Sequence, residues 1–151
     1  MRNKQKGFSL IELLIVVAII LIIAAIAIPN LLRSKIAANQ ASAVASLRTL
    51  NTSAALFNTN YNLYPSSIAN MGTAATVTST SADLIDTVLA GGVKSGYSFT
   101  WTGGGTSGAY TITADPSNPS TGTVHYFTDQ SLVIRSNATA AATVNDLPIG
   151  N

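Results

Sequence analysis

One apolar run near the N-terminus restricts what this chain can fold into more than any other feature. From Phe8 to Ile28 there are 21 residues, and Glu12 is the only charged one among them. As a helix this run would be about 31 Å long, which matches the roughly 30 Å hydrocarbon core of a bilayer. We therefore expect residues 8–29 to form a helix that can span a membrane.

The residues before the run are basic. Arg2, Lys4 and Lys6 precede Phe8, and no acidic residue lies among them. By the positive-inside rule the N-terminus stays in the cytoplasm, and the chain beyond Pro29 crosses the membrane. The predicted topology is N-terminus in and C-terminus out.

Two ordinary interpretations of the run compete with a retained functional helix. The first is a cleaved secretory signal, because Ala25-Ile26-Ala27 resembles a small-residue cleavage site. Glu12 argues against it, since a carboxylate within the apolar region costs free energy and an ordinary signal gains nothing from it. The second is a plain signal anchor, in which Glu12 lies close enough to the interface to be tolerated.

The residues around Glu12 favour a third interpretation. Gly7-Phe8-Ser9-Leu10-Ile11-Glu12-Leu13-Leu14, after a short basic leader, resembles the processing site of type IV prepilins and pseudopilins. The resemblance implies that a prepilin peptidase removes residues 1–7 by cutting between Gly7 and Phe8, and that the same enzyme N-methylates Phe8. It also implies polymerisation into a helical filament, served indirectly by an assembly ATPase and an inner-membrane platform protein.

The same resemblance gives roles to two residues of the retained helix. Glu12 is expected to pair with the N-terminal amine of Phe8 in the adjacent subunit and so to set the register of assembly; an intrahelical or lipid-headgroup interaction is the alternative. Pro29 lacks a backbone N–H, so it should kink the helix or open it locally. By resemblance, that stretch is helical in the membrane and extended in the filament.

Cleavage would change the charge of the chain. The full sequence has a formal charge of +2, from 8 basic and 6 acidic residues. Removing Arg2, Lys4 and Lys6 leaves 8 − 3 = 5 basic residues against 6 acidic ones, or −1 for the side chains. The excess of positive charge therefore belongs to the leader, and we predict no direct binding of nucleic acid.

Beyond Pro29 the sequence predicts a globular head over residues 30–151. Residues 30–61 continue the helix with an amphipathic pattern, and polar residues such as Ser46 and Ser53 are assigned to its other faces. The apolar stripe has these members: Ile36, Ala43, Leu47, Leu50, Ala54, Phe57 and Tyr61. Residues 62–96 read as a loop containing one short helix, Asp83–Ala90, with Ser81 as its cap and Gly91-Gly92 as its end.

Residues 97–136 alternate between apolar and polar positions, as strands do. We predict four antiparallel strands in two hairpins, with a loop over residues 115–119; the strands are 97–102, 109–114, 124–128 and 132–135. With the long helix packed against this sheet, the predicted class is α+β, with the architecture of a pilin. The aromatic residues of the strands are interpreted as core.

Chemistry-bearing residues are sparse. His125 is the sole histidine and has no recognisable partner in the sequence, and there is no cysteine. Asp83 and Asp86 are interpreted as capping or solvated residues, so we expect no metal, no cofactor and no enzymatic activity. Asn51-Thr52-Ser53 and Asn137-Ala138-Thr139 match the glycosylation sequon, which is a common triplet.

Together these patterns predict the major structural subunit of a type IV pilus. The precursor would be a single-pass inner-membrane protein, and the assembled filament would be extracellular. Two alternatives stay open: a pseudopilin of a type II secretion system, and a membrane-anchored binding domain that never polymerises. Whether a filament would serve adhesion, motility, DNA uptake or electron transfer is left open by the sequence.

Overall fold

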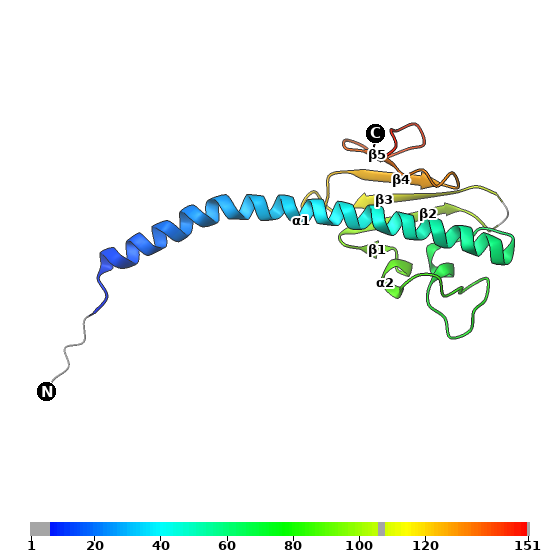
Figure 1. Ribbon diagram of the computed structural model, residues 1–151, viewed down its shortest axis with the longest axis horizontal. Coiled ribbons are helices and arrows are strands. Elements are labelled where there is room, and N and C mark those ends of the chain that lie inside the picture. The colour runs from blue at the N-terminus through cyan, green and yellow to red at the C-terminus, as the bar shows by residue number, and fades with distance from the viewer. Residues whose placement is uncertain (1–6, 106–107, 151) are drawn as a thin grey trace. The chain divides into compact units, whose positions relative to one another are not determined.

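The computed structural model describes residues 7–105 and 108–150, so the predicted leader lies outside the described residues except for Gly7. Its elements follow one another as a long helix, two short helical turns and a sheet (Figure 1). They are α1 (Leu10–Tyr61), η1 (Ile68–Met71), α2 (Thr87–Ala90), β1 (Val93–Lys94), β2 (Tyr97–Gly103), β3 (Tyr110–Pro116), β4 (His125–Asp129) and β5 (Arg135–Asn137). The predicted α+β class is confirmed.

Helix α1 has 52 residues and ends where the chain takes a left-handed turn. Asn62 has a φ of 55°, a conformation that asparagine tolerates better than most residues. Its N–H donates to the carbonyl oxygen of Asn58 at 2.8 Å, which closes the last turn. The predicted end of the helix at residue 61 is therefore correct.

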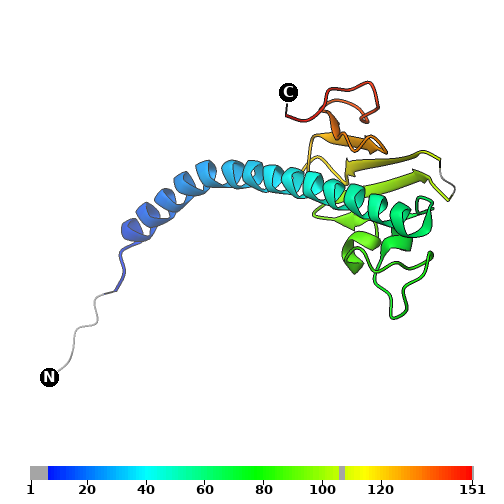
Figure 2. The same cartoon turned by 45° about the vertical axis from the view of Figure 1, so that its right-hand side comes forward.

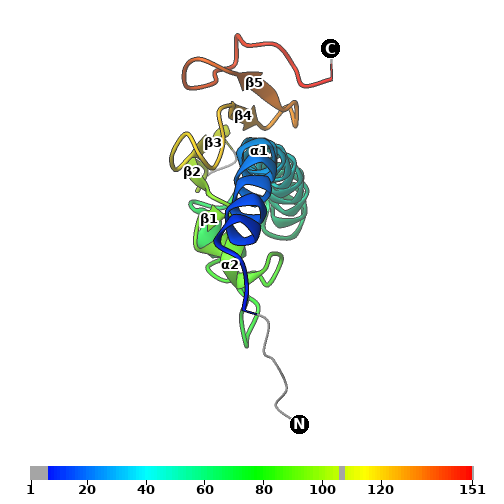
Figure 3. The ribbon, with the colours of Figure 1, turned by 90° about the vertical axis from the view of Figure 1, so that its left-hand side faces the viewer.

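The chain divides into two compact units, residues 1–34 and 35–151. The second unit holds the outer half of α1, both short helical turns and the whole sheet. Within it the sheet lies against one side of α1, with β1 and α2 at one flank and β5 at the other (Figures 2 and 3).

The sheet is an antiparallel meander of five strands in the order β1-β2-β3-β4-β5. The prediction of four strands missed β1, which lies in the predicted loop 62–96. It also placed the last strand too early, because β5 starts at Arg135. Leu132 has a φ of 63°, and its N–H donates to the carbonyl oxygen of Asp129 at 2.9 Å, so a turn occupies the place of the predicted strand start.

Strand β3 runs further than predicted and takes in residues that were assigned to a loop. Asp115 lies opposite Ser98, and Pro116 lies opposite Tyr97 at the end of the ladder. A proline is tolerated at a strand end because its missing N–H interrupts few ladder hydrogen bonds. Asp115 therefore belongs to the sheet, with consequences for His125.

The core forms between α1 and the inner face of the sheet, as predicted. Five stripe residues of α1 are fully buried, whereas Ile36 and Tyr61 are half-buried. The buried five are Ala43, Leu47, Leu50, Ala54 and Phe57. Their sheet partners in the same cluster are Tyr97, Phe99, Tyr110, Ile112 and Ala114.

The assignment of two polar residues to the outer faces of α1 was wrong. Ser46 and Ser53 are each only 4% exposed, as is Asn51. The covered sector of the helix is wider than the apolar stripe because loops also reach over it; the Ser53 hydroxyl, for example, donates to the carbonyl oxygen of Leu84 at 3.3 Å. A small hydroxyl can be buried at little cost when it finds such an acceptor.

Helix α2 is shorter than predicted and has a different cap. Asp83 has a φ of 51°, which excludes it from a helix, and α2 begins after Asp86. The Asp86 carboxylate accepts the Leu89 N–H at 2.9 Å and pairs with the Lys94 ammonium at 3.0 Å. These two interactions lower the pKa of Asp86. Ser81 is therefore not the cap, whereas the capping role of Asp86 is confirmed.

Candidate processing and assembly site

Gly7, Phe8 and Ser9 form a short non-helical segment ahead of α1. Phe8 is 79% exposed, and no atom lies within 4 Å of the position that a Cβ on Gly7 would take. The Gly7–Phe8 bond, which is the predicted cleavage site, is thus in an open segment outside the helix.

Ser9 and Glu12 form a capping box at the start of α1. The Ser9 N–H donates to Oε2 of Glu12 at 2.8 Å, and the Ile11 N–H donates to Oγ of Ser9 at 3.4 Å. The Leu13 N–H then donates to the Ser9 carbonyl oxygen at 3.2 Å. A serine at the cap and a glutamate three residues later satisfy reciprocally the N–H groups that a helix start leaves unpaired.

This interaction was missed in the sequence, although the signal was present. Ser9-Leu10-Ile11-Glu12 has the S-x-x-E spacing that defines the capping box. In the isolated chain Glu12 therefore has an intrahelical partner, which is the alternative left open for it. Only Oε2 is engaged among the described residues, so Oε1 is free to accept a second donor. Pairing of Glu12 with a neighbouring amine stays a prediction.

The inner part of α1 exposes an apolar surface. Judged by length and composition, this helix can cross a membrane. Its large apolar residues from Leu10 to Ile28 are each at least 44% exposed. An apolar surface of this extent on a soluble monomer is unusual and marks contact with lipid or protein.

Pro29 lies inside α1, and the helical assignment continues on both sides of it. Its ring cannot donate the hydrogen bond to residue 25 that a standard helix has at this place. Local opening or kinking at Pro29, including melting in a filament, stays a prediction.

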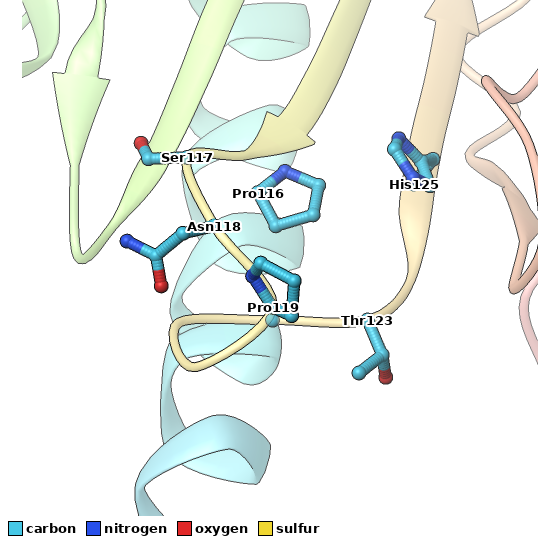
Figure 4. Close-up of a pocket in the computed structure, with 7 residues that line it drawn as sticks. Pro116, Ser117, Asn118, Pro119, Thr123 and His125 are labelled. Carbon is cyan, nitrogen blue, oxygen red and sulfur yellow. The ribbon is translucent and has the colours of Figure 1, made fainter.

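His125 has a partner, contrary to expectation. Its Nδ1 lies 2.6 Å from Oδ1 of Asp115, and both side chains are partly exposed. The last pair of the β3–β4 ladder is Ala114 opposite Tyr126, and Asp115 and His125 are the next residues beyond it, so this register brings the two side chains together. His125 also borders a hollow of about 450 Å³ formed with the loop from Pro116 to Thr123 (Figure 4). The pair joins the ends of two strands beside that loop.

Both sequon asparagines are engaged in the fold. Asn51 is buried, and its Nδ2 donates to Oγ1 of Thr128 at 2.9 Å. Asn137 donates from Nδ2 to Oδ1 of Asp146 at 2.9 Å, while its own Oδ1 accepts the Thr139 N–H at 2.9 Å. Each amide nitrogen is thus engaged by a hydrogen bond within the fold, so the structure does not favour either sequon.

Metal-ligating side chains do not gather in the described part of the chain. Within residues 7–105 and 108–150, no group of three or more histidine, aspartate or glutamate side chains could hold a metal ion. Asp83 and Asp86 lie in the same loop region, where Asp86 is occupied by Leu89 and Lys94.

Comparison with known proteins shows that the N-terminal part of the chain matches a known sequence motif. The model of the prokaryotic N-terminal methylation motif matches residues 2–28. That range contains Gly7, Phe8 and Glu12 as well as the apolar run. The chain therefore combines a match to this motif with a long N-terminal helix that precedes an antiparallel sheet.

Curated relatives are pilins and secretion pseudopilins. The type IV wide pilus major component PilA4 of Thermus thermophilus is 46% identical over 69 residues, covering 46% of this chain and 52% of the relative. The type IV major pilin PilA of Myxococcus xanthus is 51% identical over 49 residues, covering 32% and 22%. The type II secretion system core protein G of Aeromonas hydrophila is 33% identical over 64 residues, covering 42% and 45%.

The chain thus spans about half the length, or less, of these relatives. The matches agree with the predicted resemblance: over less than half of its length the chain is similar to type IV pilins and to core protein G of type II secretion systems. These relatives are named as components of pili and of secretion systems.

Proposed function

We propose that this chain is the major structural subunit of a type IV pilus. Its precursor is inserted in the inner membrane with the N-terminus inside, cut between Gly7 and Phe8 and N-methylated at Phe8 by a prepilin peptidase. The mature chain then polymerises by burying residues 8–29 in the core of a helical filament. An assembly ATPase and a platform protein act on it indirectly, and it binds no nucleotide itself.

The observation that carries the proposal is the exposed apolar half of α1 with one carboxylate at its start. The large apolar side chains from Leu10 to Ile28 are exposed in the isolated chain, and Glu12 lies where this surface begins. Lipid covers such a helix before assembly, and neighbouring helices of the same kind cover it afterwards. After cleavage, the new amine at Phe8 gives a buried Glu12 an oppositely charged partner.

A pseudopilin of a type II secretion system is the second candidate, and the similarity to core protein G supports it. Both candidates would be cut and methylated in the same way, and they differ in whether the polymer extends beyond the cell surface. A pilus extends from the cell surface, whereas loss of a pseudopilin blocks secretion without removing surface fibres. Deletion of the gene, scored for surface fibres and for secreted proteins, separates them.

The first test of the proposal is intact mass and N-terminal sequencing of protein recovered from sheared surface material. We expect a chain that begins with N-methylated Phe8 and lacks residues 1–7. A chain found only in membranes and still beginning at Met1 would contradict the proposal and would favour an anchored domain that never polymerises.

A further inference from the structure

Charge is divided unevenly between the outer half of α1 and the rest of the head. Residues 30–61 contain three basic residues and no acidic one, or +3; residues 62–150 contain five acidic and two basic residues, 2 − 5 = −3. The basic residues of the helix are Arg33, Lys35 and Arg48. The outer half of the helix and the rest of the head therefore have net charges of opposite sign.

Most of the acidic side chains are satisfied within the chain. Asp86 pairs with Lys94, and Asp115 with His125. The Asp146 carboxylate accepts from Thr143 and Asn137. The remaining two carboxylates are those of Asp129, which accepts the Ser131 N–H at 2.9 Å, and Asp83.

Asp83 is the acidic residue with the fewest internal interactions. It is exposed, and its φ of 51° places it at a sharp turn of the chain between η1 and α2. Its backbone is held by a hydrogen bond from its N–H to the carbonyl oxygen of Gly72 at 2.9 Å. Within residues 7–105 and 108–150, its carboxylate has neither a hydrogen bond nor an ion pair. The backbone of this turn is therefore held in place, whereas the Asp83 carboxylate has no partner within the described residues.

Arg48 is the corresponding cation on the helix. It is exposed, and no carboxylate of the described residues lies within salt-bridge distance of it. Two hollows border it, one of about 400 Å³ that also contacts Leu56 and Leu84, and one of about 270 Å³ that also contacts Leu132. Leu56 and Leu132 are 50% and 51% exposed.

Arginine is enriched at the centres of protein interfaces, and Arg48 has exposed apolar side chains and hollows beside it. Because Arg48 and Asp83 each lack an ion pair among the described residues, we propose that Arg48 of one subunit pairs with Asp83 of a neighbouring copy of the same chain. This inference rests on the proposed function, since it requires a polymer. The contact is heterologous: each copy offers Arg48 to one neighbour and Asp83 to another, which propagates without closing.

Charge reversal tests this pairing in filaments of the full-length chain. Arg48→Asp and Asp83→Arg, expressed singly, should each lower the yield of sheared filaments about tenfold or more, because like charges then face each other. Expressed together, the two variants should restore the yield, because a subunit with two acids can alternate with one with two bases. Rescue in the mixture requires contact between chains and excludes a pairing within one chain.

Asp129→Arg is the matched control, because it makes the same charge change at a partly exposed acid that, like Asp83, has no ion pair among the described residues. Normal filaments from Arg48→Asp alone, or no rescue by Asp83→Arg, would overturn the inference; rescue by Asp129→Arg in its place would overturn the choice of Asp83. Unaltered Trp101 fluorescence of each purified variant in micelles checks that the head is folded. Wild-type filaments must form in parallel, and their absence would contradict the proposed function itself.

A second measurement uses the lack of cysteine in the chain. A variant with Arg48→Cys and Asp83→Cys, treated in intact filaments with a short bifunctional maleimide, should give ladders of cross-linked multimers. The same treatment of Arg48→Cys with Asp129→Cys should leave monomers. Ladders in the second variant and not in the first would contradict the proposed contact.

Discussion

Nδ2 of Asn51 donates to Oγ1 of Thr128 at 2.9 Å, and the two residues join the buried face of α1 to β4. The same amide also receives the Tyr110 hydroxyl, which donates to Oδ1 at 3.4 Å. No described buried side-chain nitrogen or oxygen lacks a hydrogen-bond partner. A fully satisfied polar group in an apolar core restricts how the helix can slide against the sheet, because any other register leaves it unpaired.

Asn51→Leu should therefore destabilise the head although it adds apolar volume. It leaves the hydroxyls of Thr128 and Tyr110 buried without a partner, at a cost of about 1–3 kcal/mol in the free energy of unfolding. Urea unfolding followed by the fluorescence of Trp101, the sole tryptophan, measures the change. Thr128→Val added to Asn51→Leu should recover part of the loss, and strictly additive losses would show that the two side chains are not coupled.

The Asp146 carboxylate holds the C-terminal segment in place by hydrogen bonds, in a chain that has no cysteine and so no disulfide. Its carboxylate accepts the Thr143 N–H at 2.6 Å, the Thr143 hydroxyl at 2.9 Å and the Asn137 amide at 2.9 Å. Hydrogen bonds from Thr143, first from its backbone and then from its side chain, lower the pKa of Asp146, with Asn137 and Arg135 contributing. The folded form thus favours the ionised carboxylate.

The resulting pH dependence has a definite sign. A carboxyl group whose pKa is lower in the folded state stabilises that state above its unfolded pKa, about 3.9 for aspartate, and loses this contribution as the pH falls through the folded value. Asp146→Asn should therefore lower the melting temperature at pH 7, and the difference from wild type should shrink below about pH 4. Asp129→Asn serves as the control, and a difference that is constant with pH would rule out this role of Asp146.

Local residues explain which features of the fold could be predicted. The stripe containing Leu47, Leu50 and Phe57 has helical spacing that is visible in any window of the sequence, and the strand pattern around Phe99 is equally local. The capping box of Ser9 and Glu12 could also have been predicted, from the S-x-x-E spacing in the sequence. These features depend on residues a few positions apart, which is why the class was correct.

Features that were missed depend on distant pairings. The contact of His125 with Asp115 requires the register of β3 on β4, and the burial of Ser53 requires knowing that Leu84 crosses over α1. The turn at Leu132 depends on a positive φ, which is unfavourable for leucine and which its neighbours must enforce. Periodicity carries no information on such tertiary constraints.

The contributions of Ser9 and Glu12 to the helix cap can be tested separately, because each side chain accepts a hydrogen bond from a different backbone N–H. Ser9→Ala removes the acceptor of the Ile11 N–H, and loss of such a cap costs about 0.5–2 kcal/mol of helix stability. The exchange of the Ile11 and Leu13 amides in micelles should accelerate. Ser9→Thr retains a hydroxyl and should exchange like wild type. Unchanged exchange in Ser9→Ala would show that its hydroxyl does not stabilise the helix start.

Glu12→Ala tests assembly itself. Removing one carboxylate leaves a more apolar segment, so membrane insertion should be intact. In the filament, however, the amine at Phe8 of each mature subunit would be buried without its counter-charge, which is strongly unfavourable. We therefore expect the Glu12→Ala chain to accumulate in the membrane and to give no sheared filaments, as measured by fractionation and immunoblotting. Ser9→Ala is the matched control, since it weakens the same helix cap but keeps the carboxylate of Glu12. Filaments from Ser9→Ala and none from Glu12→Ala would show that the loss of charge prevents assembly. Normal filaments from Glu12→Ala would contradict the pairing of Glu12 with the amine of Phe8.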